Sequence, residues 1–287
     1  MKKIVLMLGV FIFSFGMIKQ SKAECYAKEA HYTQLPSCYD TWNPGVSNNC
    51  GDGCTYNYNN GKLTVTATKP TAVIPEGIFS PSYYEAGKLP KISNVEIAGE
   101  FNTIGQHAFL DNRANISGKD GVLYLNNVSH HAFGENTLSG TVIINDKQTS
   151  LGSGHLYNIA LGATVILPQT IKNISAWVAY GLILGNNAKI YCGAENCEQM
   201  FQDIDCNTLK EEYRNLCQFR LDALLSSGKL FSYPDGCTKM DATGCTKCKS
   251  SNFSLEYGYC YRKRYTLQEA DEATSNDYEN MIEWIFE

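Results

Sequence analysis

Apolar residues recur along the middle of this chain with a spacing of about 23 residues. They form two columns, Ile104, Val128, Leu151 and Ile174 in the first, and Phe109, Phe133, Leu156 and Ala179 in the second. The steps within the first column are 24, 23 and 23 residues. A spacing of this size predicts a stack of similar units, because one short unit cannot bury its apolar side alone.

Short β-branched runs accompany these columns. They occupy residues 95–97, 142–144, 165–167 and 188–190, and the last three are again 23 residues apart. The second unit departs from the register, because Val122, Leu123 and Leu125 lie closer to Val128 than the spacing requires. One strand in each unit of roughly 20–29 residues is typical of leucine-rich repeats. The predicted fold is therefore a leucine-rich-repeat-like solenoid, with one short strand per ~23 residues and disulfide-rich amino- and carboxy-terminal caps.

The segments on either side of the repeats predict these caps. Alternating residues around Asn60-Gly61 indicate a β-hairpin that covers the first unit. Helical spacing of apolar residues predicts a helix from about residue 206 to 225, ended by Gly228. A capping-box pattern at Thr266 predicts a second short helix, and the alternating tail over 281–287 predicts a strand.

The chain begins with a pattern typical of a secretion signal. Lys2 and Lys3 precede an apolar run over residues 4–18, and Ser21-Lys22-Ala23 forms a small-residue cleavage site. The expected organisation is a signal peptide at 1–23, an amino-terminal cap at 24–71, repeats at 72–192, a helical cap at 193–230 and a cysteine-rich module with a tail at 231–287.

Twelve cysteines follow the predicted signal, and export makes disulfides their expected state. The first group is Cys25, Cys38, Cys50 and Cys54; the second is Cys192, Cys197, Cys206, Cys217, Cys237, Cys245, Cys248 and Cys260. Because each group contains an even number of cysteines, we expect disulfides to form within the groups. Three connectivities are possible in the first group and 105 in the second.

Charge and hydropathy exclude some classes of partner. The whole chain has 24 basic and 29 acidic residues, and removal of 1–23 takes away four lysines, so the net charge changes from −5 to −9. This balance argues against nucleic acid, whose phosphates require a basic surface. Beyond the signal, no segment is apolar and long enough to span a membrane. The oligomeric state is left open.

Two units carry a more specific pattern, Ile104-Gly105-x-x-Ala108-Phe109 and Val128-x-x-x-Ala132-Phe133. Together with CGDGCTYNYNNGKLTVT at residues 50–66, they resemble the BspA-like leucine-rich-repeat proteins of bacterial surfaces, over residues 50–192. The resemblance implies a secreted or surface protein that adheres to an extracellular or surface protein, is not an enzyme and needs no cofactor. The alternative is a structural component of the cell envelope without a specific soluble ligand.

Alternation along the predicted strands places one row of residues on the outer face of the sheet. This candidate binding face contains Glu96, Ile143, Ile166 and Lys189. Two adjacent exposed isoleucines indicate a contact site. The alternative is that the carboxy-terminal module, including Trp284 and Phe286, covers them.

No metal site and no catalytic site is predicted. Cys245-x-x-Cys248, with Cys237 and Cys260, offers thiols for zinc, but an exported chain favours disulfides. His107 and His131 share a repeat column about 4.8 Å apart, but that column offers no third ligand, so solvated loop histidines are expected. Asp203 and Asp205 are expected on a solvated face, and the sequence contains no nucleophile and base at catalytic spacing.

Overall fold

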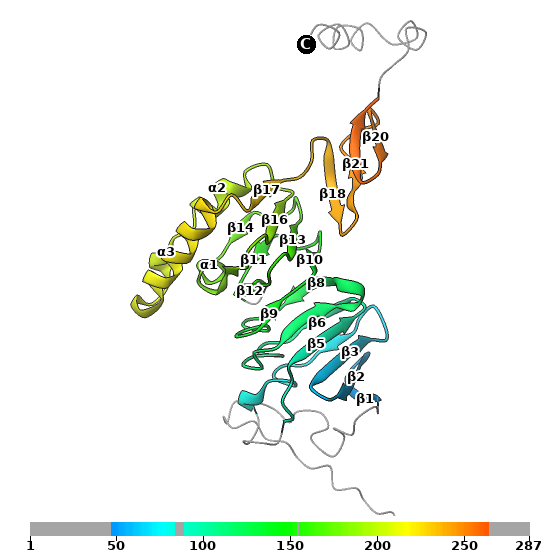
Figure 1. Ribbon diagram of the computed structural model, residues 1–287, viewed down its shortest axis with the longest axis vertical. Coiled ribbons are helices and arrows are strands. Elements are labelled where there is room, and N and C mark those ends of the chain that lie inside the picture. Colours follow the sequence, from blue (N-terminus) through cyan, green and yellow to red (C-terminus); the bar gives the residue numbers. More distant parts are fainter. Residues whose placement is uncertain (1–46, 84–88, 154, 264–287) are drawn as a thin grey trace, which may run out of the picture.

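The computed structural model describes residues 47–83, 89–153 and 155–263. Within these residues, the strands form an eight-stranded sheet, a seven-stranded sheet and three two-stranded sheets. Figure 1 shows the strands of the two large sheets following one another along the long axis of the molecule, with α1, α2 and α3 on one side and the carboxy-terminal hairpins projecting beyond the strands.

The eight-stranded sheet begins with antiparallel strands and continues with parallel ones. Its strands in order are β1 (Ser47–Gly51), β2 (Cys54–Asn59), β3 (Lys62–Ala67), β5 (Asn94–Ala98), β7 (Asn115–Gly118), β9 (Thr137–Leu138), β12 (Asn158–Ile159) and β15 (Ile183–Leu184). Asn60 and Gly61, with φ of 46° and 83°, make the turn between β2 and β3. The predicted hairpin is confirmed, and it extends one end of the sheet.

The seven-stranded sheet is parallel throughout. Its strands in order are β17 (Leu230–Ser232), β16 (Lys189–Cys192), β13 (Thr164–Leu167), β10 (Thr141–Ile144), β8 (Val122–Val128), β6 (Phe101–Ile104) and β4 (Val73–Ile74). Val142 pairs with Val165, as the 23-residue spacing predicts, but Val165 then pairs with Ile190 rather than with Ala188. The last unit is therefore two residues longer than expected.

The main core lies where the two sheets face each other. Inward side chains of both sheets, such as Ile97 and Leu123, are at most 2% exposed. Stacked rings of Phe79, Phe109 and Phe133 continue the core into the turns, with centroids 5.4 and 5.8 Å apart. The repeat columns are confirmed at these positions, because Ile104 also pairs with Val128, and Leu151 with Ile174.

The predicted fold class is wrong. A leucine-rich-repeat solenoid with one short strand per unit leaves a single sheet, whereas each unit here contributes one strand to each of two sheets. Val95 illustrates the difference, because it pairs with Ile116 in the eight-stranded sheet while Val142 lies in the other sheet. The second set of strands was hidden because β9 and β12 are two residues long and each buries only one side chain.

Helices cover the carboxy-terminal end of the stack. They are α1 (Ala176–Gly181), α2 (Cys197–Gln202) and α3 (Glu211–Ser226), with the 3₁₀ turn η3 (Cys206–Thr208) between α2 and α3. Two further 3₁₀ turns, η1 (Pro81–Tyr83) and η2 (Lys119–Gly121), lie among the earlier strands. The predicted helix is confirmed as α3, although it starts later because η3 forms a separate turn held to α3 by the Cys206–Cys217 disulfide. Gly228 follows the helix with φ of 64°, a backbone conformation that suits glycine. A small two-stranded sheet joins β11 (Ser150–Leu151) and β14 (Asn173–Ile174).

Two antiparallel hairpins form the carboxy-terminal module. The first is β18 (Cys237–Asp241) with β19 (Gly244–Cys248), and the second is β20 (Phe253–Glu256) with β21 (Tyr259–Arg262). The signal peptide at 1–23 and the helix and strand expected after residue 263 lie outside the described residues.

Every cysteine in the described part of the chain is in a disulfide. The pairs are Cys50–Cys54, Cys192–Cys197, Cys206–Cys217, Cys237–Cys245 and Cys248–Cys260. Each of the five disulfides joins two cysteines of the same group, as predicted. Cys25 and Cys38 lie outside the described residues. None of the helices in the described part of the chain is both long and apolar enough to cross a membrane.

Candidate functional site

The four residues predicted to form one binding face do not lie in one row. Ile143 and Ile166 are neighbours on β10 and β13. Glu96 belongs to β5 in the other sheet, where its carboxylate forms an ion pair with Lys62 at 2.8 Å. Lys189 pairs with Thr164, two positions before Ile166, so it lies on the same outer face but outside the row of the isoleucines.

An apolar row does cross the outer face of the seven-stranded sheet. Its members, paired in order across β8, β10, β13, β16 and β17, are Tyr124, Ile143, Ile166, Tyr191 and Phe231. The row is exposed at its ends, where Tyr124 and Phe231 are each 38% exposed, and buried at its centre, where Ile143 is 8% and Ile166 is 2% exposed.

The carboxy-terminal module covers the centre of this row. Cys237, Met240 and Cys245 of the β18–β19 hairpin form a buried cluster with Ile143 and Ile166. The isoleucines therefore attach the module to the sheet, which is the covering that the sequence left open as an alternative. Trp284 and Phe286 lie outside the described residues.

Polar contacts surround this apolar cluster. Lys239 forms a 2.5 Å ion pair with Asp146, and the Tyr233 hydroxyl donates a 2.8 Å hydrogen bond to the Leu167 carbonyl. Burial, followed by the charge of Asp146, raises the pKa of Tyr233 above its usual range, so this hydroxyl remains a donor. The module is thus held by apolar contacts with hydrogen bonds at their border.

The second hairpin of the module leaves its three tyrosine side chains exposed. Tyr257 at its turn is 93% exposed, and Tyr259 and Tyr261 on β21 are 55% and 51% exposed. The rings of Tyr259 and Tyr261 lie 6.4 Å apart on the same face of the strand. We call residues 253–262 the tyrosine hairpin; Figure 1 shows it, as β20 and β21, at the far end of the molecule from β1. The feature of the sequence that could have indicated this hairpin is the Tyr257-Gly258 turn between two alternating segments.

Positive charge accompanies the tyrosine hairpin. Residues 231–263 contain five basic and three acidic residues, whereas the whole chain has a net charge of −5. Lys249 and Arg262 both lie over the Phe253 ring, at 5.3 and 5.7 Å from its centroid. The module is therefore a basic region of an acidic protein.

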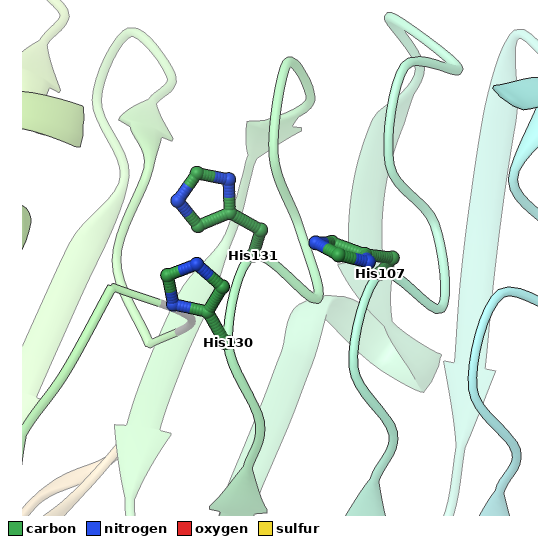
Figure 2. A group of neighbouring side chains, drawn as sticks. All are labelled: His107, His130 and His131. Carbon is green, nitrogen blue, oxygen red and sulfur yellow. The ribbon is translucent and has the colours of Figure 1, made fainter. Parts of the chain in front are cut away.

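Among the residues that the structure describes, two groups of side chains have the donor atoms and the proximity to hold a metal ion. The first, Cys237, Cys245 and Cys260, is engaged in disulfides, so its sulfur atoms are not thiolate ligands. The second comprises His107, His130 and His131 (Figure 2), whose nearest ring nitrogens all lie within 4.8 Å of one another. His130 precedes His131 and is not a member of the repeat column, so the repeat spacing gives no signal for it.

The three histidines form a partly buried cluster. His130 and His131 have ring centroids 4.0 Å apart, and His107 lies 6.0 and 5.9 Å from them. Burial, followed by the charges of His130 and His107, lowers the pKa of His131 to about 4. Burial also lowers the pKa of His130.

No protein-family model matches this chain, and neither a curated protein nor a solved structure matches it.

Proposed function

We propose that this chain is an exported, non-catalytic protein that binds another protein at or outside the cell surface. Its contact surface is the tyrosine hairpin. The observation that carries this proposal is the exposure of three neighbouring tyrosines, Tyr257, Tyr259 and Tyr261, at 93%, 55% and 51%.

Tyrosine suits a protein contact for physical reasons. Its ring buries a large apolar area with few rotatable bonds, and its hydroxyl still donates and accepts hydrogen bonds. Tyrosine is also enriched among the residues that dominate binding energy.

The backbone of the hairpin supports binding because it is cross-linked. The Cys248–Cys260 disulfide joins β19 to β21, and the Cys237–Cys245 disulfide joins β18 to β19. The β18–β19 hairpin is in turn packed on Ile143 and Ile166. A surface held in this way loses little conformational entropy when a partner binds.

The disulfides also support the export part of the proposal. Disulfides persist in oxidising compartments and are rare in the cytosol. The described residues contain five, and the sequence of residues 1–23 has the features of a secretion signal.

The charge of the module favours an acidic partner. Arg262 and Lys263 follow the tyrosines, and Lys247 and Lys249 precede them. Such cations increase the rate of association with a surface that carries carboxylates, and this effect decreases as salt is added. The preferred partner is therefore an extracellular protein with an acidic contact surface.

A binding experiment with matched variants tests this function. The mature chain would be measured against purified extracellular and cell-surface proteins, with envelope polysaccharides as the comparison. A variant with Tyr257, Tyr259 and Tyr261 all replaced by Ser should lose affinity for its protein partner by about 100-fold or more, since residues of this kind often cost about 2 kcal/mol each. The control carries Leu216→Ser and Phe219→Ser, which remove exposed apolar side chains from α3.

The outcomes separate the proposed function from the alternative. Saturable protein binding that is lost in the tyrosine variant and retained in the α3 variant supports a contact through the hairpin. Binding to envelope polysaccharide alone, unchanged in both variants, would favour the structural envelope component instead.

A further inference from the structure

The geometry points to a metal site in this chain: His107, His130 and His131 bind one divalent transition-metal ion of the zinc class through their imidazole nitrogens. This inference is independent of the tyrosine hairpin, because the two sites involve different elements of the fold.

The backbone of two stacked turns brings the three rings together. His107 follows β6 and His131 follows β8, so they occupy the same position in adjacent units. The His107 amide donates a 3.1 Å hydrogen bond to the His130 carbonyl, and the Phe109 amide donates one of 2.9 Å to the Ala132 carbonyl. These bonds fix the relative position of the two turns, and Figure 2 shows the His107 ring directed toward the other two.

The two histidines of the repeat column have a backbone conformation that is uncommon for residues other than glycine. His107 and His131 have φ of 54° and 50°, in the left-handed region that glycine adopts most easily. The preceding unit has Gly77 at this position, with φ of 62°. Two successive units therefore carry an imidazole at a position that glycine adopts easily, and histidine is among the residue types that tolerate this conformation.

Hydrogen bonds to the outer nitrogens orient two of the rings. The Tyr83 hydroxyl donates to Glu76 at 3.4 Å and also lies against Nδ1 of His107. Because that hydroxyl has one proton, its oxygen accepts the Nδ1 proton of a neutral His107, which places the lone pair on Nε2. Metal-binding histidines typically have such an oxygen partner on the other ring nitrogen.

His130 has an equivalent arrangement. Its Nδ1 lies 2.5 Å from the Ser153 hydroxyl, a residue of the next unit. The remaining nitrogen, Nε2, is then the ligand atom on the side of His131 and His107 (Figure 2). Side chains from four successive units are thus either members of the histidine cluster or hydrogen-bond partners of its members.

The distances require only a small adjustment. Ligand nitrogens at 2.0–2.1 Å from a tetrahedral zinc lie roughly 3.4 Å from each other. The ligand nitrogens here lie within 4.8 Å of one another, so side-chain rotations that move each nitrogen by roughly 1 Å bring them to this spacing.

The donor set defines the class of ion. Imidazole suits zinc, copper and nickel, whereas calcium and magnesium prefer oxygen ligands. Three protein ligands leave a fourth position for water or another small ligand, which is typical of exchangeable rather than closed structural sites. Trp177 packs beside the cluster, with its ring 5.8 Å from His131 and 6.2 Å from His130, and covers part of it with apolar surface.

Calorimetric titration of the metal-free mature chain with Zn²⁺ tests the proposal. The expected result is one ion bound per chain. His130→Asn should weaken binding by about 100-fold or more, since even changes to the hydrogen-bond partners of ligands cost about 10- to 100-fold. His130 is exposed, so this variant should keep its melting temperature.

Two further variants complete the test. His131→Asn also removes a ligand, and asparagine tolerates the left-handed backbone conformation at this position. Glu256→Gln removes a carboxylate of β20, which is not part of the cluster, and this variant should bind zinc as the unchanged chain does. Binding of Co²⁺ should give the visible absorption of a tetrahedral site, and His130→Asn should abolish it.

Two results would overturn the proposal. One is the absence of saturable zinc binding in the unchanged chain. The other is equal zinc affinity in the unchanged chain, His130→Asn and His131→Asn.

Discussion

Ile143 and Ile166 lie side by side on β10 and β13, and the β18–β19 hairpin packs over both of them. They point away from the main core, yet they are only 8% and 2% exposed. The module that carries the tyrosine hairpin is therefore attached to the sheet through this pair.

Replacement of Ile166 by Lys should destabilise the protein. The change places a charge in an apolar cluster beneath Met240 and removes a well-packed side chain, which together cost about 3 kcal/mol or more. For a chain of this size we expect the melting temperature to fall by roughly 5–10 °C. Differential scanning calorimetry measures the change.

Tyr124→Lys is the matched control for that variant. Tyr124 belongs to the same row, but it is 38% exposed at the end that the hairpin leaves uncovered. Its replacement should change the melting temperature by no more than a degree or two. Equal effects at both positions would show that the hairpin does not cover the centre of the row.

Asn136→Ala should lower stability because Asn136 is fully buried and connects two adjacent turns. Its side-chain amide donates to the Phe109 carbonyl at 2.6 Å and to the Gly134 carbonyl at 2.8 Å, and its oxygen accepts from the Ala114 amide at 3.0 Å. Loss of these bonds leaves buried backbone groups unpaired, at a cost of about 2–3 kcal/mol. Urea unfolding measures the difference.

The exposed Asn102 provides a comparison for Asn136. Asn102→Ala removes one 3.4 Å side-chain hydrogen bond and should change the unfolding free energy by less than about 0.5 kcal/mol. Similar losses for the two variants would contradict a structural role of the buried asparagine.

The repeat spacing predicted the stacking better than it predicted the sheets. The columns through Ile104 and Phe109 were correct because each unit supplies an apolar residue that is in the core or packs against it at these positions. The second sheet was missed because Leu138 and Ile159 each stand alone between partly exposed residues. Two-residue strands carry too little alternation to be recognised, and their pairing depends on contacts between units.

The candidate sites were also predicted only in part, because they depend on contacts between units. Alternation correctly placed Ile143 and Ile166 on an outer face, but the burial of that face depends on Met240, about 75 residues later in the sequence. His130 was missed because it lies beside the repeat column, and only the fold brings its ring toward His107. Both sites are formed by contacts between segments that are distant in the sequence. The spacing of residues along the sequence does not predict such contacts.

Tyr83→Phe should weaken zinc binding by about 10-fold while leaving the fold intact. The variant keeps the buried ring and removes the hydroxyl that orients His107. Calorimetric titration with Zn²⁺ measures the affinity, and Tyr58→Phe, on β2, serves as the control. An unchanged affinity in Tyr83→Phe would exclude this hydroxyl as a positioning group.

Stability should decrease as the pH falls from 7 toward 4 in the presence of a chelator. Burial lowers the pKa values of His130, His131 and His155, in the case of His131 to about 4. Below the unfolded-state value of about 6.5, the unfolded chain binds protons that these folded residues do not, so acid favours unfolding. Melting temperatures measured in steps of one pH unit should fall across this range.

His131→Asn identifies the source of that dependence. Without the His131 imidazole, the decrease in melting temperature between pH 6.5 and 4.5 should be smaller. A melting temperature that rises between pH 7 and 5 in the unchanged chain would contradict the predicted direction.

Site-specific photo-crosslinking tests the binding function most directly. A photoreactive phenylalanine analogue would replace Tyr257 in one variant and Phe219, which is 70% exposed on α3, in the other. With a protein partner from the binding measurements, we predict a discrete crosslinked product from position 257 and none from position 219. Crosslinking from position 219 alone, or equally from both positions, would contradict a contact through the tyrosine hairpin.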